Sequence, residues 1–164
     1  MIKLPKGFTL IELLMVMGVL AGLVSIGLMT YPGAQKSARD TRRKSDTKQY
    51  QTSLETFANR SNGLYPHYAG QTNLNTLCGS TVLNIPSGSC VDDPLASQDY
   101  NYFSSGGSGV AGSASATGYV IYASLERTQD GNNQYWVICS SGSSGRVNTS
   151  AWTPSATCPA NLVP

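Results

Sequence analysis

The sequence has few charged residues and only one histidine, and these shortages exclude several kinds of site. Only 12% of its 164 residues are Asp, Glu, Lys or Arg. Because His67 is the only histidine, a metal site with two histidine ligands cannot form within one chain. A Ser-His-Asp triad would depend on the same residue, which lies in YPHYAG, an expected exposed turn. We therefore expect no enzyme active site and no cofactor.

Cysteines are few, and none of them forms a close CxxC-type pair. All four lie from Cys78 onward, at positions Cys78, Cys90, Cys139 and Cys158. A zinc site needs close pairs, so the pattern favours disulfide bonds instead. An even number of cysteines in an exported region allows two disulfides with three possible connectivities. Proximity in the sequence favours Cys78–Cys90 and Cys139–Cys158.

One long apolar run dominates the N-terminal part of the chain. It extends from Phe8 to Tyr31, and Glu12 is its only charged residue. As a helix it would span about 36 Å, which exceeds the bilayer core of about 30 Å. The run is too long for the apolar part of a cleaved secretory signal, and no A-x-A site follows it. The sequence thus predicts a membrane-spanning helix, in which an unpaired carboxylate costs about 2.5–3.5 kcal/mol at the bilayer centre.

The stretch KGFTLIELLMVMGVLAGLV, residues 6–24, resembles the signature of type IV prepilins. That family includes type IV pilins and the pseudopilins of type II secretion systems. The match comprises a short basic leader, a glycine, an aromatic, Thr-Leu-Ile, a glutamate and an unbroken apolar helix. The resemblance implies that prepilin peptidase cleaves between Gly7 and Phe8 and methylates the new amine of Phe8. It also implies that Glu12 pairs with the Phe8 amine of a neighbouring subunit during filament assembly.

The same resemblance implies an α+β, type IV pilin-like fold, in which a long N-terminal helix packs on a small antiparallel β-sheet head. We divide the chain into a cleaved leader (1–7), a transmembrane and filament-core helix (8–34), an amphipathic helix continuation (35–60) and a β-rich globular head (61–164). Pro32-Gly33 is expected to kink or locally open the helix. The expected partners are prepilin peptidase, copies of this chain and related pilin subunits, an inner-membrane assembly platform and the membrane.

The helix continuation carries a short apolar stripe. Tyr50, Leu54 and Phe57 are spaced as i, i+4 and i+7, which predicts that one helix face packs on the head. Asn62-Gly63 is a typical helix stop, so we expect the helix to extend from about Phe8 to about Arg60.

A basic segment lies between the apolar run and this stripe. Residues 36–48 contain six basic and two acidic residues. Asp40 with Lys44, and Arg42 with Asp46, are expected to form i,i+4 pairs on the solvent side of the helix. Because the segment mixes acids with bases and lacks interleaved aromatics, it argues against a nucleic-acid partner. We expect a solvated helix face, or one that pairs with acidic heads in a filament.

The head has the pattern of a small β-sheet. Residues 118–126 and 134–140 flank a turn signal in TQDGNN and predict a hairpin. Residues 99–103 are expected to add a third strand, and residues 104–117 to form a mobile loop rich in Gly, Ser and Ala. Four alternating apolar residues are expected to face the helix stripe: Tyr119, Ile121, Ala123 and Leu125.

Two remaining motifs in the head carry little chemistry. The GxGxxG pattern at residues 107–112 is not followed by a helical pattern, so no dinucleotide site is expected. Asp92 and Asp93 are candidate calcium ligands, but few other acids lie near them in the sequence, so a turn is favoured there.

Two features of the sequence give opposite indications of the side of the membrane on which the head lies. Two lysines precede the apolar run and six basic residues follow it, which by the positive-inside rule places the head in the cytoplasm. Disulfides, by contrast, place the head outside the cytoplasm. Together with the family resemblance, they lead us to expect a single-pass protein of the cytoplasmic (inner) membrane with its head outside. The subunit is then expected to enter a periplasmic or extracellular filament. The expected function is that of a structural filament subunit. The alternative is a membrane-anchored surface or periplasmic binding protein that does not polymerise.

Overall fold

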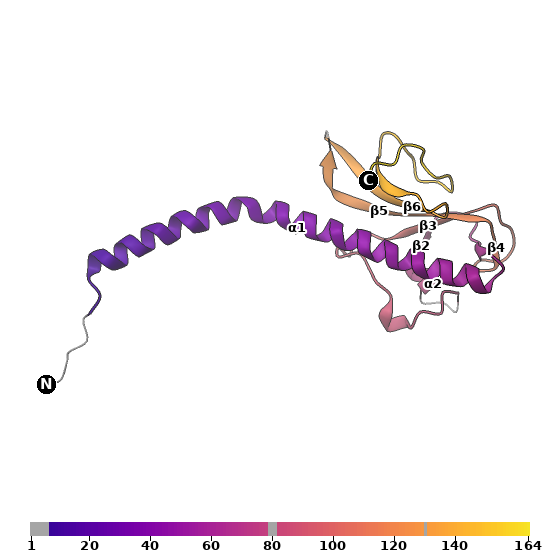
Figure 1. The fold of residues 1–164 in the computed structure, drawn as a ribbon, viewed down its shortest axis with the longest axis horizontal. Coiled ribbons are helices and arrows are strands. Elements are labelled where there is room, and N and C mark those ends of the chain that lie inside the picture. The colour runs from indigo at the N-terminus through magenta and orange to yellow at the C-terminus, as the bar shows by residue number, and fades with distance from the viewer. Residues whose placement is uncertain (1–6, 79–81, 130) are drawn as a thin grey trace. The chain divides into compact units, whose positions relative to one another are not determined.

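The structure is a computed structural model that describes residues 7–78, 82–129 and 131–164. The fold is mixed α+β, with an N-terminal apolar helix and an antiparallel sheet (Figure 1). The chain divides into two compact units, one up to Lys36 and the other from Ser37 to Pro164. The coarse fold expected from the sequence is therefore confirmed.

Helix α1, Leu10–Arg60, is 51 residues long and begins two residues later than expected. It continues through Pro32 and Gly33 as helix, although Pro32 has no N–H with which to continue the hydrogen-bond ladder. Its end is a left-handed cap: Asn62 and Gly63 have φ values of 55° and 80°. The Gly63 N–H donates to the Ala58 carbonyl oxygen at 2.8 Å, which satisfies a terminal carbonyl of the helix.

The strands form two antiparallel sheets. The main sheet has five strands in the order β2-β3-β5-β6-β7, and a small sheet pairs β1 with β4. The bounds are β1 Tyr65–Pro66, β2 Thr72–Asn73, α2 Leu74–Cys78, a 3₁₀ turn Ser87–Ser89, β3 Asn101–Ser105, β4 Ala114–Ala116, β5 Gly118–Gln129, β6 Asn132–Cys139 and β7 Ser144–Asn148.

The expected strands are present, with one correction. β5 and β6 form the expected hairpin, although Asp130 of its turn lies outside the described residues. β3 is the expected third strand and pairs with β5. The expectation that residues 104–117 form only a loop is wrong, because β4 lies within that range and pairs with β1. Gly107 is required there, since a Cβ would lie 2.8 Å from the Ala116 Cα.

The core lies between the C-terminal part of α1 and one face of the main sheet. The stripe of Tyr50, Leu54 and Phe57 is buried, with 2%, 0% and 8% of each residue exposed. It packs in one cluster with Tyr119 and Ile121, so the expected helix-facing side of β5 is confirmed. The opposite face of the sheet holds a second, smaller cluster that the C-terminal segment covers with Trp152 and Leu162.

Two disulfides fasten irregular segments to this framework. They join Cys78 to Cys90 and Cys139 to Cys158, with Cα atoms 5.8 and 5.9 Å apart. This is the pairing that sequence proximity favours. The first bond connects the end of α2 to the segment before β3, and the second holds the C-terminal segment against β6.

Candidate functional site

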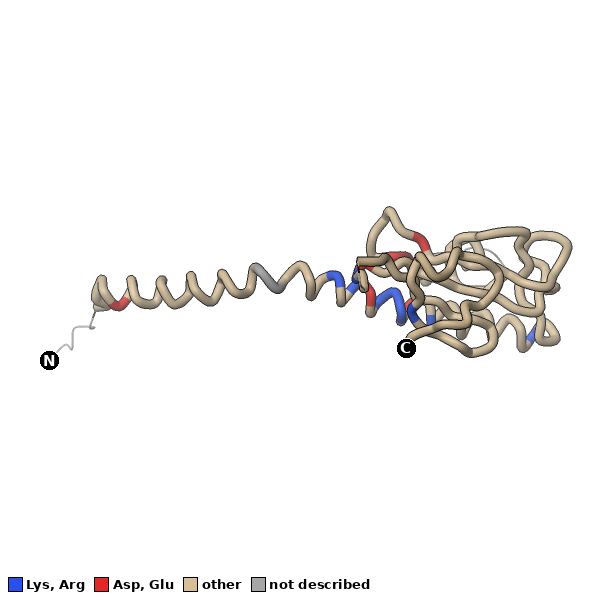
Figure 2. The backbone as a smooth tube through the Cα atoms, turned by 90° about the horizontal axis from the view of Figure 1, so that it is seen from above, with Lys and Arg blue, Asp and Glu red and all other residues tan. Residues whose placement is uncertain are grey.

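The first candidate site is the apolar part of α1. Leu10–Leu28 is the one helical segment of the described residues that is long and apolar enough to cross a membrane, and none of it is buried. Its large side chains are exposed, from 51% at Leu20 to 80% at Leu10. Glu12 is the only charged residue along it (Figure 2). A surface of this kind requires lipid or protein to cover it, so the helix can span a membrane.

The Gly7-Phe8 junction lies just before the helix and is open to solvent. Both residues are exposed, and Phe8 keeps 84% of its surface accessible. A Cβ built on Gly7 would meet nothing within 4 Å. The fold of the chain therefore gives no reason for a glycine at this position.

Glu12 has a contact that the sequence analysis did not anticipate. Its Oε2 accepts hydrogen bonds from the Thr9 backbone N–H at 3.4 Å and from the Thr9 hydroxyl at 3.3 Å. Thr9 directly precedes the first residue of α1, so this is half of a capping box at the start of the helix. The signal was present in the sequence as Thr-x-x-Glu before an apolar run. Within the described residues, no lysine, arginine or histidine lies within 4.0 Å of the Glu12 carboxylate.

The second notable arrangement is a buried ion cluster where α1 meets the head. The side chain of Arg43 has no exposed surface and donates to both oxygens of Asp93, at 2.6 and 2.8 Å. Its Nη1 also donates to Asp40 and to Glu126, each at 2.9 Å. Arg39 completes the cluster with two 2.6 Å hydrogen bonds to Glu126.

This cluster corrects the expectation of a solvated helix face. Asp40 pairs with Arg43 rather than with Lys44, and it is buried. The Asp40 oxygens also accept hydrogen bonds from the backbone N–H groups of Glu126 and Arg127, at 2.9 and 3.0 Å. Asp40 therefore fixes β5 to the helix. The physical reason is tertiary, since partners far away in the sequence satisfy the buried charges.

The other expected pair is present in a different setting. Arg42 and Asp46 lie 3.5 Å apart, as expected from their i,i+4 spacing. Asp46, however, is mostly buried and accepts a hydrogen bond from the Tyr100 hydroxyl at 2.8 Å. It therefore anchors β3 as well as the helix surface.

The charges in the cluster stabilise one another. The hydrogen bonds from Arg39, and then those from Arg43, lower the pKa of Glu126 to about 2. Hydrogen bonding to Asp93 raises the pKa of Arg43 above its ordinary value. Because the Arg43 guanidinium donates hydrogen bonds to both oxygens of Asp93, the Asp93 carboxylate has a structural role. Among the described residues, no group of three or more His, Cys, Asp or Glu side chains is placed to hold a metal ion.

Comparison of the chain with protein-family models, curated proteins and solved structures finds no match. The assignment of a function therefore depends on the N-terminal motif and on the exposed helix that follows it.

Proposed function

We propose that the chain is a structural subunit of a type IV filament, either a type IV pilin or a type II secretion pseudopilin. Prepilin peptidase removes residues 1–7 and methylates Phe8. The mature subunit then leaves the membrane and packs its apolar helix among those of its neighbours. The head forms the outer wall of the filament.

The observation that carries this proposal is the uncovered apolar segment Leu10–Leu28, placed directly after an exposed Gly7-Phe8 junction. Lipid covers such a helix before assembly, and the helices of other subunits cover it afterwards. A plain membrane anchor would need the helix but would not need the junction. Since the fold does not require glycine at position 7, recognition by a peptidase is a sufficient reason for it.

Glu12 has a place in both states of the subunit. In the free subunit its carboxylate caps the first turn through Thr9, close to the membrane interface. In the filament it pairs with the Phe8 amine of a neighbour, which neutralises two charges away from water. The exchange of a weak intrachain contact for an ion pair would favour correct axial alignment of each incoming subunit.

The disulfides support a head outside the cytoplasm. Such bonds persist in oxidising compartments, and both close segments of the head. In this orientation the leader and the cleavage junction lie on the cytoplasmic side. The basic residues that follow the apolar run are partly neutralised, because Arg39 and Arg43 are paired within the buried cluster. The positive-inside rule counts lysine and arginine largely regardless of acidic partners, so taken alone it still favours the opposite orientation.

The proposal is tested by shearing filaments from cells that express the chain with its native assembly machinery. The sheared fraction is examined by electron microscopy and by immunoblotting for the subunit. Expression of Gly7→Leu provides the comparison, since blocked cleavage should keep the chain in the membrane and out of filaments. If the chain never enters a sheared or pelletable polymer while it is processed normally, it is a membrane-anchored binding protein instead.

A further inference from the structure

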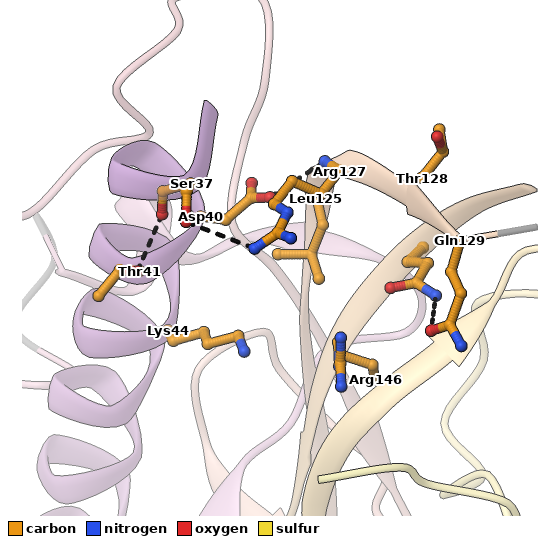
Figure 3. A pocket seen from close by; sticks show the side chains of 10 residues that line it. Ser37, Asp40, Thr41, Lys44, Leu125, Arg127, Thr128, Gln129 and Arg146 are labelled. Atoms are coloured by element: carbon orange, nitrogen blue, oxygen red, sulfur yellow. Dashed lines mark hydrogen bonds between the residues drawn. The ribbon is translucent and has the colours of Figure 1, made fainter. Parts of the chain in front are cut away.

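A cavity of about 340 Å³ lies within the head, between α1 and strands β5 to β7. Figure 3 shows its lining, to which α1 contributes Lys44 and the strands contribute Arg127 and Arg146. The Lys44 side chain extends from the helix toward the strands. Most of the remaining lining is polar and uncharged, and it comprises Ser37, Thr41, Thr128, Gln129 and Gln134.

Within the part of the chain that the structure describes, the three cations of this cavity have no Asp or Glu partner. Among the described residues, no Asp or Glu oxygen lies within 4.0 Å of Lys44, Arg127 or Arg146. The guanidinium of Arg127 donates a long hydrogen bond of 3.4 Å to the Ser37 hydroxyl. The Arg146 side chain is held in place by a 2.9 Å bond from Nη2 to the Pro164 oxygen, while its Nε is buried without a partner.

Lys44 is fixed near the other two cations rather than free to turn away. Its Nζ lies 4.4 Å from the centre of the Trp136 ring, and Trp136 is directly opposite Arg146 in the β6–β7 register. Burial, and then the positive charges of Arg146 and Arg127, lower the pKa of Lys44. The carboxylate of Asp40 also lines the cavity, but it is already engaged by Arg43 and by two backbone N–H groups. The cavity therefore keeps an excess of positive charge.

We propose that this cavity is a binding site for a tetrahedral oxyanion, a phosphate or sulfate group, which Lys44, Arg127 and Arg146 coordinate. A single arginine fork suits the two coplanar oxygens of a carboxylate. Three cations from α1, β5 and β7 instead surround a ligand that offers acceptors in several directions. The volume exceeds that of a bare ion, since one water molecule occupies about 30 Å³ of liquid. The site thus has room for a small polar molecule that carries the phosphate or sulfate group.

This inference does not depend on filament formation, and it is tested on the full-length protein in detergent. Inorganic phosphate, inorganic sulfate and glucose 6-phosphate are titrated by calorimetry, with sodium chloride used to keep the ionic strength constant. Saturable binding of one equivalent is expected. At a concentration of about ten times the Kd, the ligand should raise the Tm by about 3–6 °C. Comparison of the free ion with the sugar phosphate shows which form the cavity prefers.

Two variants locate the binding within the cavity. Arg146→Gln and Lys44→Gln should each weaken phosphate binding by about 10-fold or more, because a charge-assisted hydrogen bond is lost. Arg42→Gln is the matched control, since Arg42 is an exposed cation on the same helix that does not line the cavity. It should leave the Kd unchanged. If Arg146→Gln fails to fold, Lys44→Gln carries the test, because it removes no bond to the C-terminal segment.

Three outcomes would overturn the proposal. If chloride at the same ionic strength raised the Tm as much as phosphate does, the effect would be screening of the charges and not specific binding. An unchanged phosphate affinity in both cavity variants would place the ion elsewhere. Binding of a DNA oligonucleotide without binding of phosphate, sulfate or the sugar phosphate would indicate an extended basic surface instead of a cavity for one group.

Discussion

The Glu12 carboxylate accepts a hydrogen bond from the Thr9 backbone N–H at 3.4 Å, so the one charge of the apolar segment caps its own helix. This contact gives Glu12 a role within the subunit in addition to the proposed pairing with a neighbour. The two roles need different properties of the side chain. Capping requires only an acceptor oxygen, whereas pairing with an amine requires a negative charge.

Substitution of Glu12 separates these roles. Glu12→Gln keeps an acceptor for Thr9 but removes the charge, and Glu12→Val removes both. We expect both variants to be inserted and cleaved, and we expect both to form few or no filaments. The measurement is the filament yield after shearing, beside an immunoblot of processed subunit in the membrane.

The control for this prediction is Thr9→Ala, which removes the hydroxyl donor but keeps the charge of Glu12. It should form filaments at nearly normal yield. Normal filaments from Glu12→Gln, with loss in Glu12→Val, would show that only the cap matters. Loss of the membrane-held monomer itself in Glu12→Val would mean that the residue serves insertion or folding.

Replacement of Arg43 should destabilise the head strongly. Arg43→Met leaves Asp93, Asp40 and Glu126 in a buried site without their common partner. Breaking a buried ion cluster in this way costs about 3–5 kcal/mol of unfolding free energy. Arg42→Met is the control, and the loss of its single pair, in which the arginine is exposed, should cost about 0–1 kcal/mol. Urea unfolding followed by tryptophan fluorescence measures both, and equal midpoints for the two variants would contradict the account.

The stability of the head should fall in acid over a defined range. The pKa of Glu126 is about 2 in the folded protein and near its ordinary value of 4.5 when unfolded, so folding favours the charged form. The stabilisation is complete above pH 4.5 and is lost as the pH falls toward 2. Glu126→Gln should flatten this part of the stability–pH curve. A variant with the same acid sensitivity as the native protein would show that other carboxylates control the transition.

The Cys139–Cys158 disulfide should hold the C-terminal segment over the second cluster of the sheet. Replacing both cysteines with alanine is expected to lower the unfolding free energy by about 2–4 kcal/mol. It should also increase hydrogen exchange around Val147, which this segment covers, and around Trp152 within the segment. Peptide mapping without reduction provides the direct check of the pairing. Mixed pairing with Cys78 or Cys90, or four free thiols, would contradict the structure.

Local patterns in the sequence predicted the framework of the fold well. The spacing of Tyr50, Leu54 and Phe57 identified the buried helix face, and the alternation from Tyr119 to Leu125 identified the face of β5 that meets it. Asn62-Gly63 marked the helix end because a left-handed cap needs residues that tolerate positive φ. These features depend on periodicity or on backbone conformation, which a short stretch of sequence specifies.

Features that depend on distant partners were not predicted. The i,i+4 rule gave Asp40 the wrong partner, because Arg43, Glu126 and Arg127 meet it only after β5 packs on the helix. β4 was missed because its three residues lie in a stretch rich in glycine and serine, and only pairing with β1 makes them a strand. The lining of the cationic cavity comes from four elements, α1, β5, β6 and β7, so no single stretch of sequence contains its signal.

The central claim is that the chain is a processed filament subunit, and intact mass spectrometry of the subunit from sheared filaments tests it most directly. The account predicts a chain that begins at Phe8, carries a methyl group on its new amine and keeps both disulfides. A filament subunit that still carries residues 1–7, or one that is cut after a position between Ser25 and Ala34, would contradict it.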